Sequence, residues 1–280
     1  MTKEQIGLDR ITPSMLSEYE ICPKLFFYRS WLGLKLPEPQ RHLNFGTAIH
    51  KAIGNIYEQY DSKTRWKYAE FGVVRKTFLD NWTLNCISDI DFKDKELKKQ
   101  CYEDMLFDGL KMLKEYWDNK EVYESIDDIN ITAMEIPIKV EMINPETKQT
   151  LPIPLSCRLD ALTKSGKIVE FKTSSSLYDE NETRSKPQGL AYSFAYLMKN
   201  GKLPQGLDYL VMLKGRKKDN VAKATRIQHI RLKHDESDML AFFSRVKVIL
   251  QKIINREFNR PLVSHANYCD CRKFEDTLKI

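Results

Sequence analysis

The chain has 280 residues, of which 42% are hydrophobic and 30% charged, and its formal net charge is +6. This composition is ordinary for a globular protein with a sizeable core and leaves no low-complexity segment. No apolar run approaches the about 20 residues that a membrane-spanning helix needs, and the N-terminus lacks the apolar core of a secretion signal, so we expect a cytoplasmic protein without a membrane partner.

Helical patterns dominate the first half of the chain. Thr12 and Pro13 predict the start of a short helix that runs to Ile21, and Pro23 restarts it before a cluster of aromatic residues. Residues 33–40 predict a loop. The spacing of apolar residues predicts three further helices, which we expect to form a lid or arm: Gly46–Tyr60, about Tyr68–Leu84 and Leu97–Trp117.

After Asn130 the hydrophobic period changes to that of strands. Three strands are predicted to form a meander, and two more follow with helices between and after them. This order predicts an α/β fold in which a small mixed sheet carries helices on both faces. The predicted strands are 131–142, 155–162, 167–172, 207–213 and 227–232, and the predicted helices are 187–199 and 238–258.

The hairpin around Lys164-Ser165-Gly166 is the most informative segment. It predicts Asp160 beside the start of the return strand, where Glu170 and Lys172 share one face. Two carboxylates suit magnesium or manganese, and a neighbouring lysine can orient a water for phosphodiester cleavage. The alternative is a polar hairpin with an ordinary cross-strand ion pair. The apolar residues around these charges favour burial, and buried acids need a partner.

Positive charge is concentrated directly after this hairpin. Residues 184–233 hold twelve lysines or arginines but two acids, which favours a polyphosphate partner such as DNA. A solvated turn is an equally good interpretation of the basic run itself, which contains Lys214, Arg216, Lys217 and Lys218. Nearby aromatic residues could stack on bases, although their spacing is more typical of a core: Tyr192, Phe194, Tyr196 and Tyr209.

Four motifs in order resemble the PD-(D/E)XK nuclease superfamily, and specifically its RecB-like branch, which also contains the CRISPR-associated adaptation exonucleases. The resemblance covers about residues 12–275 and implies a restriction-endonuclease-like core. The motifs are Ser14–Tyr28, Gly46–His50, Asp160 with Glu170-Phe171-Lys172, and Gln188–Tyr192.

The resemblance implies a role for each matched residue. His50, Asp160 and Glu170 would bind Mg²⁺ or Mn²⁺, with the Phe171 carbonyl as a further ligand, and Lys172 would hold the attacking water. Gln188 and Tyr192 lie on one helical face, where they could contact the lysine, a phosphate or a base, or pack in the core instead. Gly46 and Gly54 leave room around the imidazole of His50, which could otherwise be a core or surface histidine.

Six cysteines without a secretion signal argue against a disulfide framework. Some relatives bind an iron–sulfur cluster through one N-terminal and three C-terminal cysteines. Cys22, Cys269 and Cys271 supply three of those four, so we expect no cluster, and Cys22 would pack against the C-terminal segment. A zinc site that adds His265 is a further alternative.

The sequence therefore predicts a single nuclease domain over residues 1–280, with a helical arm at about 48–128 and a core at about 130–260. We expect a metal-dependent deoxyribonuclease that acts on DNA ends or single strands in repair, recombination or phage DNA processing, encoded by a bacterium or a phage. The alternatives are a noncatalytic nucleic-acid-binding module and a structural subunit of a repair or CRISPR-adaptation complex.

Overall fold

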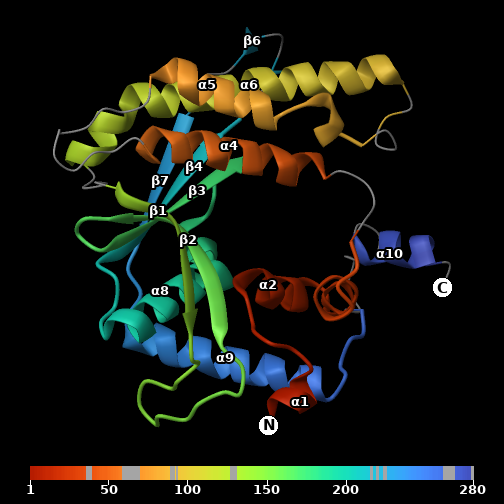
Figure 1. Cartoon of the computed structure of the whole chain (residues 1–280), viewed down its shortest axis with the longest axis vertical. Helices are drawn as coiled ribbons and strands as arrows, with labels where there is room; N and C mark the ends of the chain where they lie inside the picture. The colour runs from red at the N-terminus through yellow and green to blue at the C-terminus, as the bar shows by residue number, and fades with distance from the viewer. Residues whose placement is uncertain are drawn as a thin grey trace.

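The protein has three layers, with a five-stranded sheet between two groups of helices (Figure 1). This computed structural model describes residues 1–35, 40–58, 70–88, 92, 94–126, 131–214, 217–218, 221–222, 226–260 and 269–278. The layers confirm the predicted α/β class with a small mixed sheet and helices on both faces. Among the described residues, no helix is long and apolar enough to cross a membrane.

The sheet has the strand order β1-β2-β3-β4-β7. The predicted meander of β1, β2 and β3 is antiparallel, β3 and β4 are parallel, and β4 pairs with β7 antiparallel. A parallel neighbour requires a crossover, which α8 (Pro187–Asn200) provides. Each strand ends within two residues of its prediction: β1 Ile131–Val140, β2 Leu155–Thr163, β3 Lys167–Ser174, β4 Gly206–Leu213 and β7 Arg226–Leu232.

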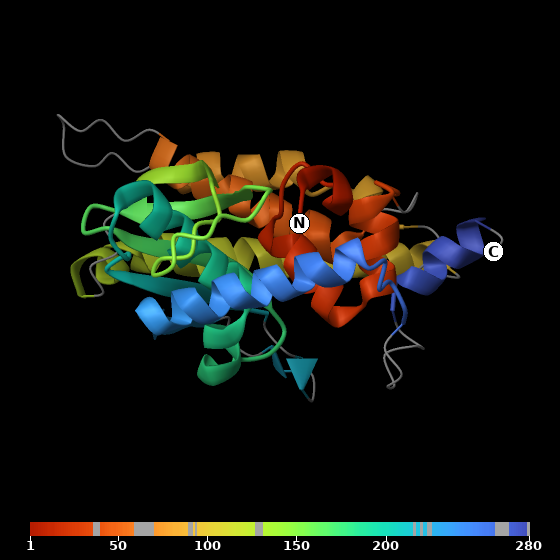
Figure 2. The same ribbon diagram turned by 90° about the horizontal axis from the view of Figure 1, so that it is seen from below.

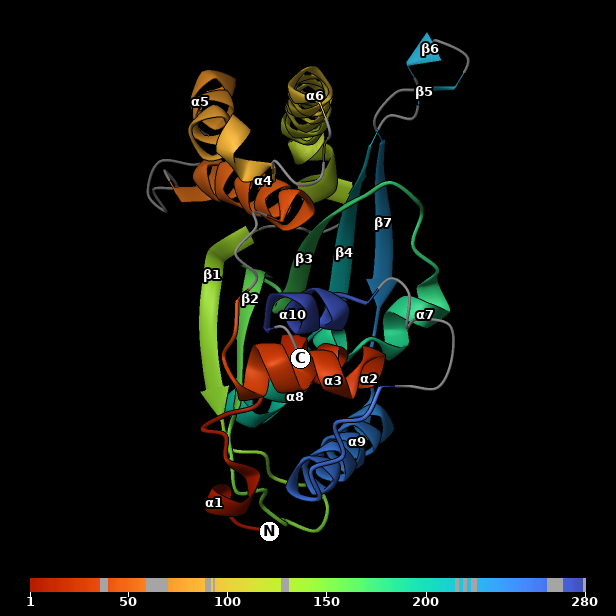
Figure 3. The ribbon, with the colours of Figure 1, turned by 90° about the vertical axis from the view of Figure 1, so that its right-hand side faces the viewer.

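Three helices, α4 (Arg41–Glu58), α5 (Phe71–Asn81) and α6 (Lys95–Ile126), cover one face of the sheet (Figure 3). The prediction placed the start of α4 at Gly46, but the helix begins at Arg41 because Phe45 also belongs to its buried stripe. The helix α6 continues past the predicted end at Trp117, and α5 is shorter than predicted, with a 3-10 turn at Leu84–Cys86. These helices share a core with the sheet that includes Phe171 and Leu210.

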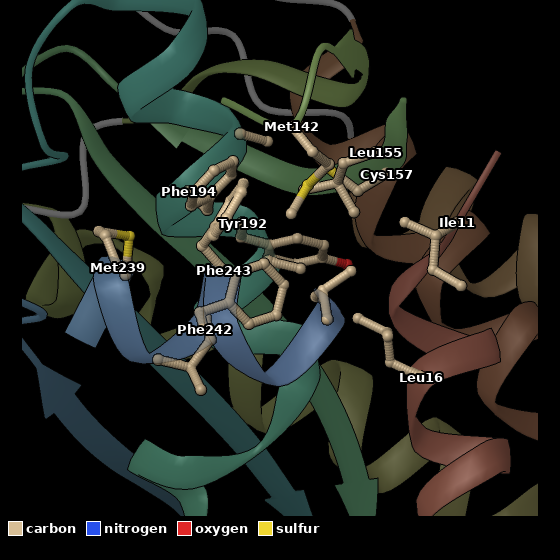
Figure 4. Close-up of a cluster of buried hydrophobic side chains, with 14 of the residues drawn as sticks. Ile11, Leu16, Met142, Leu155, Cys157, Tyr192, Phe194, Met239, Phe242 and Phe243 are labelled. Atoms are coloured by element: carbon tan, nitrogen blue, oxygen red, sulfur yellow. The ribbon is translucent and has the colours of Figure 1, made fainter. Parts of the chain in front are cut away.

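The opposite face is covered by α8 and by α9 (Glu236–Ile254). Figure 2 views the molecule from below and shows α9 running across its near side. Asp235 caps α9 by accepting a hydrogen bond from the Asp238 amide. The helices α1 (Lys3–Ile6) and α2 (Pro13–Ile21) complete this layer, and Thr12 caps α2 as predicted. Their shared core is shown in Figure 4.

The aromatic residues considered for base stacking belong to this core, which is the alternative that their spacing favoured. Each side chain is buried, because α8, which carries three of them, packs on the sheet, where β4 carries the fourth. These four aromatic residues of the basic segment therefore pack in the core and present no surface on which a nucleobase could stack. They are Tyr192, Phe194, Tyr196 and Tyr209.

The turn between β2 and β3 depends on a glycine. Gly166 has a φ of 86°, a conformation that other residues adopt at a cost, and a Cβ there would lie 2.9 Å from the Tyr196 hydroxyl. The tip of the predicted hairpin is therefore packed against α8, which fixes the strands that carry the candidate site.

The remaining elements lie at the edges of the molecule. The short helix α3 (Pro23–Phe26) leads into a π-helical turn at Phe27–Trp31, and α7 (Glu180–Ser185) precedes α8. The C-terminal helix α10 (Cys271–Leu278) lies beside α3 (Figure 3). A two-stranded ribbon of β5 (Lys217–Lys218) and β6 (Val221–Ala222) extends beyond the ends of β4 and β7.

Candidate active site

The hairpin brings the two predicted carboxylates together. Its ladder pairs Ala161 with Val169 and Leu162 with Ile168, and the register then places Asp160 opposite Glu170. Asp160 on β2 therefore lies beside the middle of the return strand β3, whereas the prediction placed it beside the start of that strand.

Asp160 is buried and is held by the backbone of the neighbouring strand. Its Oδ2 accepts a hydrogen bond of 3.0 Å from the Phe171 amide. Burial raises the pKa of Asp160 well above its ordinary value, and the negative charge of Glu170 raises it further. Two carboxylates with this mutual repulsion are stabilised when a cation binds between them.

Glu170 is fully buried, and its two oxygens have different surroundings. Oε1 accepts a hydrogen bond of 2.8 Å from the Gln188 side chain and forms an ion pair with Lys172. Oε2 has no hydrogen-bond partner among the described residues. An unpartnered buried carboxylate oxygen is unfavourable, and here it is the oxygen that a metal ion would satisfy.

Lys172 remains a cation in this environment. Burial alone would lower the pKa of Lys172, but the charges of Glu170 and Asp160 together raise it above its ordinary value. The charged ammonium can therefore donate hydrogen bonds to a water or a phosphate at neutral pH.

His50 reaches the same site from α4. Its Nδ1 lies 3.5 Å from Asp160 Oδ2. Burial lowers the pKa of His50, although the charge of Glu170 acts against this, and the Phe171 carbonyl faces the ring. A neutral imidazole is the form that binds metals. A Cβ on Gly46 or Gly54 would meet no atom within 4 Å, so the helix is open on both sides of His50 as predicted.

Sequence reasoning missed Glu135 on β1. Ligand atoms of His50, Glu135 and Asp160 all lie within 4.8 Å of one another. Glu135 has a left-handed backbone with φ 51°, and its carboxylate is 2.7 Å from Arg158. Non-glycine residues in this conformation are uncommon and gather at functional sites. In the sequence Glu135 is one polar position of an alternating strand, and its proximity to Asp160 emerges only when β1 pairs with β2.

These groups fit a hard divalent cation. Three carboxylates and one imidazole suit magnesium or manganese, and the unpartnered oxygen of Glu170 indicates where a cation would be needed. Of these groups, His50 and Glu135 line a cleft of about 680 Å³ between α4 and the sheet, which is also lined by Lys172.

Gln188 and Tyr192 lie behind the carboxylates. The Gln188 amide, which bonds Glu170, also donates a hydrogen bond of 2.9 Å to the Tyr192 hydroxyl oxygen. Burial, with a contribution from Glu170, raises the pKa of Tyr192, so its hydroxyl stays protonated. Gln188 was expected to contact the lysine, a phosphate or a base, and its contact with Glu170 was not predicted. Tyr192 packs in the core, which was the alternative for this residue.

Lys214, the one residue of the predicted basic run whose side chain the structure describes, does not line the cleft. The Lys214 ammonium is 4.8 Å from the centre of the Phe45 ring, beneath α4, and burial lowers its pKa. Arg216 lies outside the described residues, and for Lys217 and Lys218 the structure describes the backbone of β5.

The three cysteines come together at the other end of the molecule. The sulfur atoms of Cys22, Cys269 and Cys271 lie within 4.8 Å of one another, next to Tyr28 and Phe274. This confirms that Cys22 packs against the C-terminal segment. Burial raises the pKa of Cys22, and it raises the pKa of Cys271 to about 12, so these two thiols stay protonated without a metal. Three thiols do not match the four that an iron–sulfur cluster normally takes. His265, the alternative zinc ligand, lies outside the described residues.

Comparisons with known proteins agree with this geometry. A family model described as the PD-(D/E)XK nuclease superfamily matches residues 10–274. A comparison with curated proteins found no match.

A solved structure shares the fold at low identity. A protein from Eubacterium rectale, whose assignment as an exonuclease is provisional, matches with a TM-score of 0.56 and 11% identity over 95% of this chain and 88% of its own. The protein SSO0001 covers 89% of this chain and 82% of its own, with 10% identity and a TM-score of 0.34, which is too low to support an argument. The family match extends over nearly the whole chain and includes every element that carries the site. The chain belongs to the PD-(D/E)XK nuclease superfamily.

Proposed function

We propose that this protein is a metal-dependent deoxyribonuclease of the RecB-like branch, which hydrolyses phosphodiester bonds at DNA ends or in single strands. The observation that carries the proposal is the buried, unpartnered Oε2 of Glu170 beside the positively charged Lys172. A purely structural hairpin has no reason to keep such an oxygen, whereas a nuclease needs it as a metal ligand.

The residues divide the work as follows. His50, Glu135, Asp160 and Glu170 would hold Mg²⁺ or Mn²⁺, with the Phe171 carbonyl as a further ligand. The bound ion would supply Lewis acidity and lower the pKa of water. Lys172 orients the attacking water and stabilises the negative charge that develops on the scissile phosphate. Gln188 fixes one oxygen of Glu170 and so leaves the other directed to the metal.

The helical region of about residues 48–128 acts in this proposal as an arm over a nuclease core of about residues 130–260. It contributes His50 and one wall of the cleft, so the cleft lies between the two regions. The basic run at Lys214, Arg216, Lys217 and Lys218 would contact DNA outside the cleft, through phosphates rather than bases. Repair, recombination and phage DNA processing are the pathways that use such a reaction, in which protein partners of a CRISPR-adaptation or repair complex could take part.

The test uses end-labelled single- and double-stranded DNA, and RNA of the same sequence, with manganese, magnesium or EDTA. We expect metal-dependent cleavage of DNA by the wild type and by Asp9→Asn, an exposed acid far from the cleft. Asp160→Asn should abolish cleavage. The product ladder distinguishes exonuclease from endonuclease action. Binding without cleavage by the wild type under every condition would reject the proposal in favour of a noncatalytic binding module.

A further inference from the structure

The cleft follows α4 on both sides of the metal-binding histidine. Its lining runs from His42 to Asn55, which is about 20 Å of helix at the usual rise per residue. His50 lies within this stretch, so a nucleic-acid strand with its scissile phosphate at the carboxylates would contact α4 both before and after the cut position.

The two ends of this stretch differ chemically. Towards Asn55 the lining is polar: Asn55 bonds Thr77, and the Lys51 ammonium donates a hydrogen bond of 2.8 Å to Asn81. Towards His42 the cleft meets Leu43, an apolar side chain that is 64% exposed. The Asn55 end suits phosphates and sugars, whereas the other end adds the exposed apolar side chain of Leu43 to the polar His42 and Thr47.

The exposure of Leu43 is unusual within its helix. The other large apolar residues of α4, among them Phe45, Ile49 and Ile53, are fully buried. A single exposed leucine needs no explanation on an ordinary surface, but this one lies at the mouth of the cleft. It precedes His50 by two helical turns, so it is on the same face and about 10 Å away along the axis.

We propose that Leu43 contacts a nucleobase of the substrate and makes the enzyme selective for unpaired DNA ends. An apolar side chain gains little from phosphates but does gain from a base face, and that face is accessible when the base is unstacked. The about 10 Å between Leu43 and His50 spans at most about three nucleotides at the B-form rise of about 3.4 Å. The base that Leu43 contacts is therefore within three nucleotides of the cut. This inference rests on the proposed nuclease function and assigns its substrate preference.

The kinetic test compares Leu43→Ala with Leu97→Ala, a leucine on α6 that is 58% exposed and does not line the cleft. We expect Leu43→Ala to lower kcat/KM on single-stranded DNA about tenfold, the loss expected for one base contact, and on blunt duplexes less than about threefold. Leu43→Met should restore the rate. A substrate with abasic positions in the three nucleotides next to the cut should remove the difference between Leu43→Ala and the wild type. Equal effects on both substrates, or no effect of the abasic positions, would overturn the inference.

A binding test separates this inference from the nuclease proposal. Leu43→Trp in the Asp160→Asn background places a fluorophore at the cleft mouth without turnover. We expect its fluorescence, after subtraction of the Asp160→Asn signal, to be quenched by a single-stranded oligonucleotide and not by its abasic counterpart. Active wild-type enzyme without this quenching would reject the role of Leu43 alone. Quenching with an inactive wild type would reject the nuclease and retain the base contact.

Discussion

The side-chain amide of Gln188 donates a hydrogen bond of 2.8 Å to Oε1 of Glu170, which is fully buried. Gln188 lies on α8, in the layer opposite the one that carries His50. The glutamate is therefore held from the side of the sheet that α8 covers, and this hydrogen bond leaves Oε2 as the oxygen without a partner among the described residues.

Gln188→Leu should weaken metal binding. Loss of a residue that orients a metal ligand typically lowers metal affinity or activity 10- to 100-fold, and we expect a shift of about that size in the Mn²⁺ concentration that gives half-maximal cleavage. Gln251→Leu, an exposed glutamine on α9, is the matched control. An unchanged metal requirement would show that Gln188 has a packing role instead.

Lys172→Met should reduce the cleavage step rather than DNA binding. The side chain removed is a charged donor to the reacting groups, so we expect a loss of about 10² to 10³ in single-turnover rate, with DNA affinity changed only a few-fold. Lys172→Arg should not restore the rate, because a guanidinium differs in shape from an ammonium. Lys139→Met, at an exposed position on β1, should behave as the wild type. A parallel loss of affinity and rate would contradict this assignment.

Glu135→Gln and Arg158→Met should change the metal requirement in opposite directions. Glu135 and Arg158 form an ion pair, so the arginine competes with a cation for the same carboxylate. We expect the Mn²⁺ concentration that gives half-maximal cleavage to rise about tenfold in Glu135→Gln and to fall in Arg158→Met. Glu141→Gln, an exposed acid just after β1, provides the control in a metal titration of cleavage rate. The same direction for both variants would exclude Glu135 as a ligand.

Asp160→Asn should stabilise the metal-free protein. Burial, and then Glu170, raises the folded-state pKa of Asp160, so the wild type loses stability as pH rises from its ordinary value of about 4 through the folded pKa. Asparagine carries no charge and can still accept from the Phe171 amide. Urea unfolding in EDTA should give the variant the larger free energy of unfolding at pH 7, with the difference shrinking towards pH 4. A less stable variant at pH 7 would contradict the sign of this effect.

The cysteine cluster should contain no iron–sulfur centre. Three thiols meet where α3 and α10 pack, and packing with Tyr28 and Phe274 accounts for the burial of Cys22 and Cys271 and the partial burial of Cys269. Protein purified without oxygen should lack visible charge-transfer absorption, and iron analysis should give far less than one atom per chain. A stoichiometric metal would require a fourth ligand beyond these three.

Local patterns were sufficient to predict the centre of the site. Asp160, Glu170 and Lys172 lie on two strands joined by one turn, and side chains alternate along each strand, so their proximity follows from thirteen residues of sequence. Glu135 could not be found this way, because only the pairing of β1 with β2 brings it to Asp160. The aromatic residues of α8 needed the fold for a related reason. Their basic neighbours left base stacking open as an alternative to a core position, and the packing of α8 on the sheet and on α9 decides for the core.

His50 and Asp160 belong to different layers, and the chain between them contains all of α5 and α6. A cation bound by both would act as a cross-link across a long loop, much as a disulfide does, because it binds the folded chain and restricts the unfolded one. Metal depletion would then release α4 from the sheet before the sheet itself opens, and amide hydrogen exchange in α4 would quicken first. The metal occupancy of the site would thus also determine how rigidly the layer of α4, α5 and α6 is held against the sheet.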